Sequence, residues 1–249
     1  MLQQKEEQKA FYGQDVPGIV RDNFIIGGIL AALALLLGWW SKKRESTLLP
    51  LFGLLGGVIA LVASIATLES LAILWDSRIA KLRERDRLFD ELKLRGNERV
   101  LDVGCGHGLL LIEAAKRLPY GRAVGIDLWS QIDQGSNNKE ATLNNARIEG
   151  VEDRIEVHHG DMCAMPFPDG SFDVVVGIQA VHNIESPEGR REAAQEITRV
   201  LKPGGRIAIL DIYFVKQLAE YFREAGMKDV HVTGPRPYYP PMRTLTGRK

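Results

Sequence analysis

Residues 100–108 read V-L-D-V-G-C-G-H-G, and residues 109–116 continue as L-L-L-I-E-A-A-K. The apolar start predicts a β-strand, the alternate glycines Gly104, Gly106 and Gly108 predict a tight turn, and the run after them predicts a helix. Glycine admits positive φ and lets a ligand lie against the backbone, while the first N–H groups of a helix point toward the same place. The stretch therefore predicts a binding turn for a polar or charged cofactor, although glycine-rich turns also end ordinary strands.

A second short apolar run, R-A-V-G-I-D at residues 122–127, ends in the carboxylate of Asp127. It follows the glycines by about twenty residues, the spacing at which the second strand of a βαβ unit presents an acidic side chain to a ribose. One carboxylate suits the two O–H donors of a ribose diol. Together the glycine turn and Asp127 predict one nucleoside-containing ligand.

Four stretches of the chain resemble the class I S-adenosylmethionine (SAM)-dependent methyltransferases. They are V-L-D-V-G-C-G-H-G at 100–108, V-G-I-D at 124–127, G-D-M-C-A-M-P-F-P-D-G-S-F-D at 160–173 and R-V-L-K-P-G-G-R-I-A-I-L-D at 199–211. They occur in the family's order and spacing, and the resemblance covers residues 96–249. The subgroup around the ubiquinone/menaquinone-biosynthesis methyltransferases uses the same P-F-P-D-x-S-F-D and L-K-P-G-G strings. The resemblance implies an enzyme that uses SAM as its methyl donor.

Apolar strands alternate with helical stretches after residue 96, which predicts a parallel sheet with helices on both faces. The family resemblance implies a Rossmann-like, seven-stranded, mostly parallel α/β sheet whose last strand is antiparallel. The expected strands cover residues 99–103, 123–126, 154–158, 172–177, 206–210, 229–233 and 243–247. The expected helices cover residues 109–118, 139–149, 189–201 and 216–225.

The family resemblance also implies which residues hold SAM. Asp102, Gly104 and Gly106 correspond to the turn that holds its methionine part, and Cys105 lies within that turn. Asp127 corresponds to the acidic residue that takes the ribose hydroxyls.

On the adenine side, the resemblance implies that Leu128 or Trp129 packs on the base. Asp161 is expected to accept a hydrogen bond from the adenine amino group, and the Met162 N–H to complete base recognition. A turn-capping role for Asp161 is the alternative. Gln179, which follows the fourth expected strand, is a further expected cofactor contact.

The acceptor side is less specified. In this fold the segment after the fourth strand, here G-I-Q-A-V-H-N at 177–183, faces the methyl acceptor. His182 is the candidate base or acceptor contact, because neutral imidazole takes a proton near pH 7. The alternative is a histidine that packs at a helix start. Tyr213, which follows the fifth strand, is a second candidate for the catalytic pocket.

Composition narrows the classes of ligand. The formal net charge is zero, which gives no electrostatic case for nucleic acid. The Asn/Asp-Pro-Pro-aromatic string that amino-methylating relatives have after the fourth strand is absent, which disfavours DNA bases and amide nitrogens as acceptors. The two cysteines form no convincing disulfide pair. His158, His159, Asp161 and Cys163 would point in different directions from a strand and turn, so no metal site is predicted.

The first part of the chain is different in character. Residues 1–23 are polar and are expected to be a lead-in, whereas the runs 24–40 and 48–68, the latter prolonged to 75, are apolar. Tryptophans near their ends predict a hairpin of two transmembrane helices with interfacial anchors, and Gly53 and Gly57 have a spacing that lets helices approach. A signal peptide for the first run, or a buried soluble hairpin, is the alternative.

The distribution of Lys and Arg predicts the orientation of this hairpin. The larger basic total on the two flanks places both termini in the cytoplasm and the short loop outside. The loop holds Lys42, Lys43 and Arg44, and the flanks hold Lys5, Lys9, Arg21, Arg78, Lys81, Arg83, Arg85 and Arg87. Residues 76–95 predict an amphipathic linker helix, whose basic side lies on anionic headgroups or is solvated, before the domain at 96–249.

The sequence thus predicts a membrane-anchored SAM-dependent methyltransferase with its catalytic domain in the cytoplasm. We expect a small, lipophilic acceptor, because a tether raises the concentration of enzyme beside a membrane-dissolved substrate. A non-catalytic SAM-binding membrane scaffold and a protein methyltransferase are the alternatives. The acceptor atom and the oligomeric state stay open.

Overall fold

The computed structural model describes residues 9–13, 17–43, 49–130, 136–236 and 241–249. The chain divides into two units, a helical one at 14–78 and a larger one formed by 1–13 together with 79–249.

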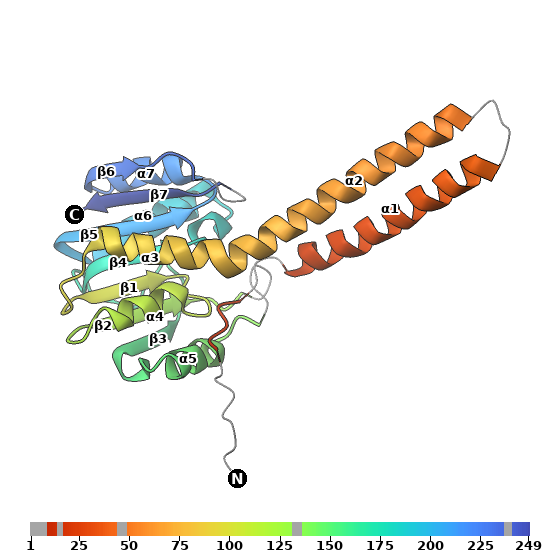
Figure 1. The fold of residues 1–249 in the computed structure, drawn as a ribbon. Helices are drawn as coiled ribbons and strands as arrows, with labels where there is room; N and C mark the ends of the chain where they lie inside the picture. The colour runs from red at the N-terminus through yellow and green to blue at the C-terminus, as the bar shows by residue number, and fades with distance from the viewer. Residues whose placement is uncertain (1–8, 14–16, 44–48, 131–135, 237–240) are drawn as a thin grey trace, which may run out of the picture. The chain divides into compact units, whose positions relative to one another are not determined.

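The larger unit is built on a seven-stranded sheet with the strand order β3-β2-β1-β4-β5-β7-β6 (Figure 1). All strand pairs from β3 to β5 are parallel, whereas β7 is antiparallel to β5 and to β6. The expected mostly parallel sheet is therefore confirmed. The strands are β1 Arg99–Val103, β2 Arg122–Asp127, β3 Ile155–His159, β4 Phe172–Ile178, β5 Leu201–Asp211, β6 Lys228–Val232 and β7 Arg243–Arg248.

Helices cover both faces of this sheet. One face packs against α6 and α7, and the other against α3, α4 and α5. The alternation along β1 shows why, because Leu101 and Val103 belong to the first core and Val100 to the second. The helices are α3 Lys81–Leu92, α4 Leu109–Lys116, α5 Lys139–Ile148, α6 Pro187–Val200 and α7 Val215–Glu224, with short helical turns η1 Asp76–Ala80, η2 Glu152–Arg154 and η3 Val181–Asn183.

The expected amphipathic helix at 76–95 corresponds to η1 and α3, which ends at Leu92. Lys93 ends it in the left-handed conformation, with φ of +46°, and donates its N–H to the Phe89 carbonyl. The apolar side of α3 is buried in the core of the sheet domain through Leu88, Phe89 and Leu92. The apolar positions of this helix thus serve the domain core.

The strand order reverses between β1 and β4. The chain adds strands from β1 to β3 toward one edge of the sheet, and then adds β4 and β5 toward the other edge. Ligands of open α/β sheets bind at such a switch point, outside the carboxyl ends of the strands. The glycine turn follows β1 at this edge, and Asp127 and Asp211 end β2 and β5 there.

The helical unit is a hairpin of α1 Pro17–Lys43 and α2 Leu49–Trp75. Helix α1 begins seven residues before Phe24, where the apolar run starts, because Pro17 suits the first turn of a helix. Both helices are long and apolar enough to cross a bilayer, and only 6% of the most apolar window of each is buried. The ability of the two helices to cross a bilayer is inferred from their length and composition alone.

The contact between α1 and α2 differs from the expected glycine contact. A Cβ added at Gly53 or Gly57 would meet nothing within 4 Å, so neither glycine lies at the helix interface. Gly27 does, because its Cβ would lie 3.2 Å from the Thr67 Oγ1 atom, and Trp40 packs edge-on against Phe52 with ring centroids 4.9 Å apart. Sequence spacing identified small residues but not the side of the helix that faces its partner.

Candidate functional site

The turn between β1 and α4 has the geometry that its glycines predict. Gly104, Gly106 and Gly108 have φ of +68°, +48° and +87°. The Gly104 N–H donates to the Ile126 carbonyl at 2.9 Å, which ties the turn to the end of β2. A Cβ at Gly104 would lie 2.4 Å from the Ala180 Cβ, in the segment after β4, so only glycine fits there.

The Asp127 carboxylate lies directly against this turn. Its Oδ2 accepts from the Gly106 N–H at 2.8 Å, and its Oδ1 accepts from the Trp129 N–H at 2.6 Å. Asn137 Nδ2 donates to Oδ1 at 3.3 Å. The carboxylate is therefore fixed at the switch point, beside the glycine backbone.

Asp102 is buried beneath the turn. Its Oδ2 accepts from the Leu111 N–H in the first turn of α4 at 2.9 Å. Its Oδ1 is buried and has no hydrogen-bond partner among the described residues. Burial, reinforced by the nearby Asp127 carboxylate, raises the pKa of Asp102 well above its usual value, against the lowering effect of the Leu111 N–H.

Two further buried oxygens are in the same condition. Gln179 Oε1 and Asn137 Oδ1 have no partner within the part of the chain that the structure describes. Buried acceptors are nearly always hydrogen-bonded, so three of them around one turn call for a ligand rich in donors. The ammonium and ribose hydroxyl groups of SAM supply such donors, and the residues present therefore fit this cofactor.

Of the other residues predicted to contact the cofactor, some face the glycine turn and others are exposed. Met162 is half-buried and its Cε lies 3.4 Å from where a Gly104 Cβ would be, so it faces the glycine turn. Asp161 is exposed, and its Oδ1 accepts from the Cys163 N–H at 2.8 Å, which is the turn-capping contact named as the alternative. Leu128 is exposed, and Trp129 packs partly against the core with φ of +61°.

Cys105 turns its side chain into the core, where a Cβ at Gly125 would lie 2.7 Å from its sulfur. Burial raises the pKa of the Cys105 thiol well above its usual value. Its N–H donates to the Ile126 carbonyl at 3.2 Å. Cys105 therefore stabilises the turn through the packing of its side chain in the core and through this backbone hydrogen bond.

His182 lies in η3, after the end of β4, and pairs with the carboxylate that ends β5. Its Nδ1 is 2.6 Å from Asp211 Oδ1, and Asp211 is fully buried. Asp211 also accepts from the backbone N–H groups of Val181, His182 and Ile212. This network holds both the imidazole and the start of η3 in place.

Asp211 was not among the residues predicted from the sequence. An acidic residue at the carboxyl end of a buried strand was the signal that identified Asp127, and I-A-I-L-D at 207–211 carries the same signal. Its partner His182 is 29 residues away, and only the pairing of β4 with β5 brings the two together.

Two exposed aromatic residues follow Asp211. The Tyr213 ring lies edge-on to the His182 imidazole with centroids 6.1 Å apart. Phe214 has φ of +56°, and the buried Arg190 guanidinium lies 3.9 Å from its ring centroid. Non-glycine residues rarely adopt this backbone conformation, and such residues concentrate at functional sites. An aromatic surface is therefore held next to the histidine.

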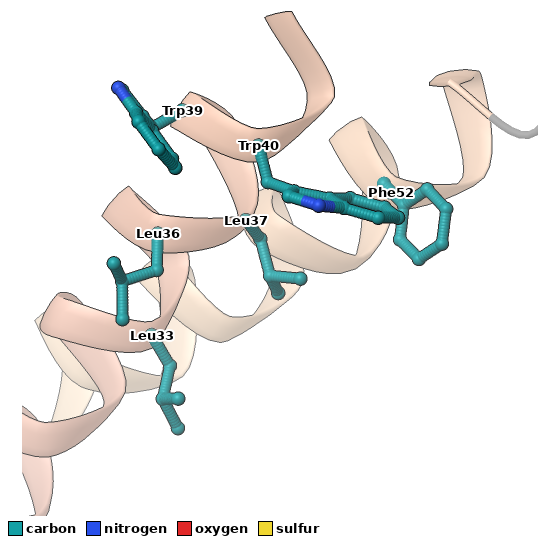
Figure 2. Close-up of a pocket in the computed structure, with 6 residues that line it drawn as sticks. All are labelled: Leu33, Leu36, Leu37, Trp39, Trp40 and Phe52. Atoms are coloured by element: carbon teal, nitrogen blue, oxygen red, sulfur yellow. The ribbon is translucent and has the colours of Figure 1, made fainter. Parts of the chain in front are cut away.

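An apolar pocket of about 430 Å³ lies in the helical hairpin (Figure 2). Its lining is aliphatic and aromatic and carries no titratable group. The lining residues are Leu33, Leu36, Leu37, Trp39, Trp40 and Phe52.

Part of the chain is similar to a known protein family. Residues 101–209 match the family described as "Methyltransferase domain". The 27-O-demethylrifamycin SV methyltransferase of Amycolatopsis mediterranei is 33% identical over 163 residues, which cover 61% of this chain and 56% of that protein. The ubiquinone/menaquinone biosynthesis C-methyltransferase UbiE of Roseobacter denitrificans is 33% identical over 128 residues, which cover 51% and 47%.

A solved SAM-dependent methyltransferase from Aquifex aeolicus has the same fold. It superimposes with a TM-score of 0.51 at 21% identity and covers 68% of this chain and 90% of that one. The chain spans about half the length of the curated relatives that it matches, 56% and 47% for the two above.

Proposed function

We propose that this chain, whose residues 101–209 carry a class I SAM-dependent methyltransferase domain, methylates a small apolar acceptor at a membrane surface. The pairing of His182 with Asp211 beside the glycine turn is the observation that carries the proposal. The buried oxygens of the site suit SAM, and the His182–Asp211 pair adds a group that can take a proton from the methyl acceptor.

On the cofactor side, the roles follow from the unpartnered oxygens. Asp102 Oδ1 and Gln179 Oε1 would accept from the ammonium of the methionine part, and Asp127 from the ribose hydroxyls. SAM, when bound, supplies an electrophilic methyl group on a sulfonium. The protein's part is to align the acceptor and to exclude water, because the sulfur leaving group needs no proton.

On the acceptor side, the dyad supports methylation of a group that arrives protonated, such as a hydroxyl. With Nδ1–H donating to Asp211, His182 presents Nε2 as a base. Nε2 would take the proton of the acceptor hydroxyl, and Asp211 would stabilise the resulting imidazolium. The acceptor oxygen would receive the methyl group from bound SAM, which would leave as the neutral thioether once its methyl–sulfur bond is broken. General base catalysis of this kind contributes about 10²–10⁴-fold in rate.

The surroundings of the dyad favour an apolar acceptor. Tyr213 and Phe214 are 57% and 47% exposed, and Arg190 fixes Phe214 in place. Exposed aromatic rings held rigidly beside a base offer a surface on which an aromatic or polyene acceptor packs. The names of two relatives, which refer to a rifamycin and to quinones, agree with small acceptors of this kind.

The helical hairpin supports a location at a lipid bilayer. Its helices expose large apolar side chains along their length, and a soluble protein rarely leaves so continuous an apolar surface in water. Basic residues on both flanks favour cytoplasmic termini and a loop on the opposite side. A cysteine introduced at Ser46 should then react with a membrane-impermeant thiol reagent added to the outside of intact cells.

Membranes containing the full-length protein, incubated with methyl-labelled SAM, test the activity. We expect label in the organic extract, and about 10²–10⁴-fold less of it with the His182→Gln variant. Label on a protein band would instead make the chain a protein methyltransferase. SAM binding without transfer of label, in membranes that contain their native lipids, would favour a non-catalytic membrane scaffold.

A further inference from the structure

We infer that residues 9–13, the segment that precedes the apolar hairpin, position the glycine turn for cofactor binding. This inference rests on the proposed binding of SAM at that turn. The segment belongs to the same compact unit as the sheet domain, and its contacts reach the turn through helix α5. We call residues 9–13 the strap.

Helix α5 holds two successive carbonyls of the glycine turn. Thr142 Oγ1 donates to the Gly106 carbonyl at 2.6 Å, and Asn145 Nδ2 donates to the His107 carbonyl at 3.0 Å. Both side chains are buried, at 0% and 4% exposure. The Gly106 N–H is bonded to Asp127 on the other side, so the backbone of the turn is held between β2 and α5.

The strap completes the hydrogen bonding of Asn145. Asn145 Nδ2 also donates to the Phe11 carbonyl at 2.7 Å, and its Oδ1 accepts from the Phe11 N–H at 3.1 Å. The side-chain amide thus pairs with both backbone groups of one strap residue, and its remaining N–H is directed at His107. If the strap leaves, two of the three bonds that fix this amide are lost, and its contact with the turn loosens.

Side chains hold the strap in place next to this amide pair. The Phe11 ring lies edge-on to the His107 imidazole with centroids 6.1 Å apart. The Tyr12 hydroxyl donates to Glu149 Oε1 at 3.1 Å, and Lys116 Nζ lies 2.7 Å from Glu149 Oε2. Burial and the Glu149 carboxylate raise the pKa of Tyr12 further above neutral, which keeps the phenol a hydrogen-bond donor at alkaline pH as well.

The strap is linked through the backbone to the apolar helix α1. Only residues 14–16 separate Gly13 from Pro17, where the apolar helix α1 begins. The same short segment is thus joined covalently to the hairpin and by hydrogen bonds to the helix that holds the cofactor turn. SAM affinity should therefore depend on residues that precede the methyltransferase domain by almost ninety positions.

The full-length variant Phe11→Ala/Tyr12→Ala tests this inference, with Tyr120→Ala as the matched control because Tyr120 is 88% exposed. We expect the dissociation constant of SAM, measured by calorimetry, to rise about tenfold in the double variant and to stay unchanged in the control. Amide hydrogen exchange at residues 104–108 without SAM should become faster only in the double variant. The kcat at saturating SAM should not change.

An unchanged dissociation constant, with faster exchange confined to residues 9–13, would overturn the inference. If the double variant does not fold, Tyr12→Phe decides in its place, because it removes only the hydroxyl bond to Glu149. A rise of at least twofold in the dissociation constant then supports the strap, and wild-type affinity overturns it. Failure of the proposed function gives a different result, since the wild-type protein itself would bind no SAM.

Discussion

The Nδ1 atom of His182 lies 2.6 Å from the Oδ1 atom of Asp211. His182 comes shortly after the end of β4, and Asp211 is the last residue of the adjacent parallel strand β5. The carboxylate is fully buried, while the imidazole is 19% exposed. A buried carboxylate that accepts from one ring nitrogen fixes the tautomer and leaves the other nitrogen free to act on a substrate. This geometry supports the proposed role of His182 as a base beside the glycine turn.

Replacing His182 by Gln should lower kcat by about 10²–10⁴-fold, because the acceptor loses its base. The dissociation constant of SAM should not change, since the imidazole is not part of the cofactor turn. Calorimetry and a methyl-transfer assay separate the two effects. The control is His231→Gln, because His231 is an exposed histidine on β6. An equal loss of activity in both variants would contradict the role of His182 as the base.

Replacing Asp102 by Asn should stabilise the protein without SAM while weakening its SAM binding. The pKa of Asp102 is raised in the folded state, so between the ordinary carboxyl pKa and the raised one, unfolding releases a proton and stability falls as the pH rises. Asn carries no charge and avoids this loss.

Thermal unfolding across this pH range measures the effect. The variant should unfold at a Tm a few degrees above the wild type at alkaline pH, since 1 kcal/mol shifts the Tm of such a domain by about 2–4 °C. The difference should vanish below the ordinary pKa of a carboxyl group. Identical pH profiles for wild type and variant would show that Asp102 is not destabilised by its burial.

Replacing Gly104 by Ala should abolish SAM binding, whereas Gly226→Ala should not affect it. Both glycines have positive φ, of +68° and +92°, so each alanine costs about 1–2 kcal/mol of backbone strain. Only the Cβ at position 104 meets a neighbour, the Ala180 Cβ at 2.4 Å, whereas nothing lies within 4 Å at position 226. Denaturant unfolding should show the strain in both variants. Equal SAM affinities would contradict the close approach at Gly104.

Replacing Ile29 by Arg tests the proposal that the helical hairpin spans a membrane. Ile29 is exposed on α1, and an arginine at the centre of a transmembrane helix costs about 2.5–3.5 kcal/mol on insertion. The wild-type protein should stay with membranes after an alkaline carbonate wash, and the variant should be partly released. Tyr120→Arg in the sheet domain should behave like the wild type. A wild-type protein found in the soluble fraction would rule out an inserted hairpin.

The features that could be predicted from the sequence are those with a local sequence pattern. The glycine turn and Asp127 were predicted because the strand, the turn and the acidic residue each have a local pattern, and the sheet brings them together as expected, with Asp127 bonded to Gly106. Six of the seven strand ranges were likewise predicted to within one residue from apolar runs between turn residues, whereas β5 begins at Leu201, five residues before the expected start at residue 206.

Long-range pairings were not predictable in this way. Asp211 acquires its importance from a histidine 29 residues away, and Phe11 from an asparagine 134 residues away. Nothing in the strap sequence, K-A-F-Y-G, indicates the second pairing. Gly53 and Gly57 matched a helix-contact spacing, yet Gly27 and Gly56 face the partner helix, because the rotation of each helix depends on all the side chains between the two. Such features depend on packing, which no single stretch of sequence specifies.

Calorimetric titration of SAM into wild-type protein and the Asp127→Ala variant tests most directly whether the glycine turn and Asp127 hold the adenosyl group. Asp153→Ala is the control, since the Asp153 side chain is 76% exposed. Hydrogen bonds to a charged carboxylate contribute about 1.5–3 kcal/mol each, so the loss of two should weaken binding about 100-fold or more. We predict measurable SAM binding to the wild type and the control, and a loss of that size in Asp127→Ala. No binding to the wild type, or equal binding to all three proteins, would contradict the account.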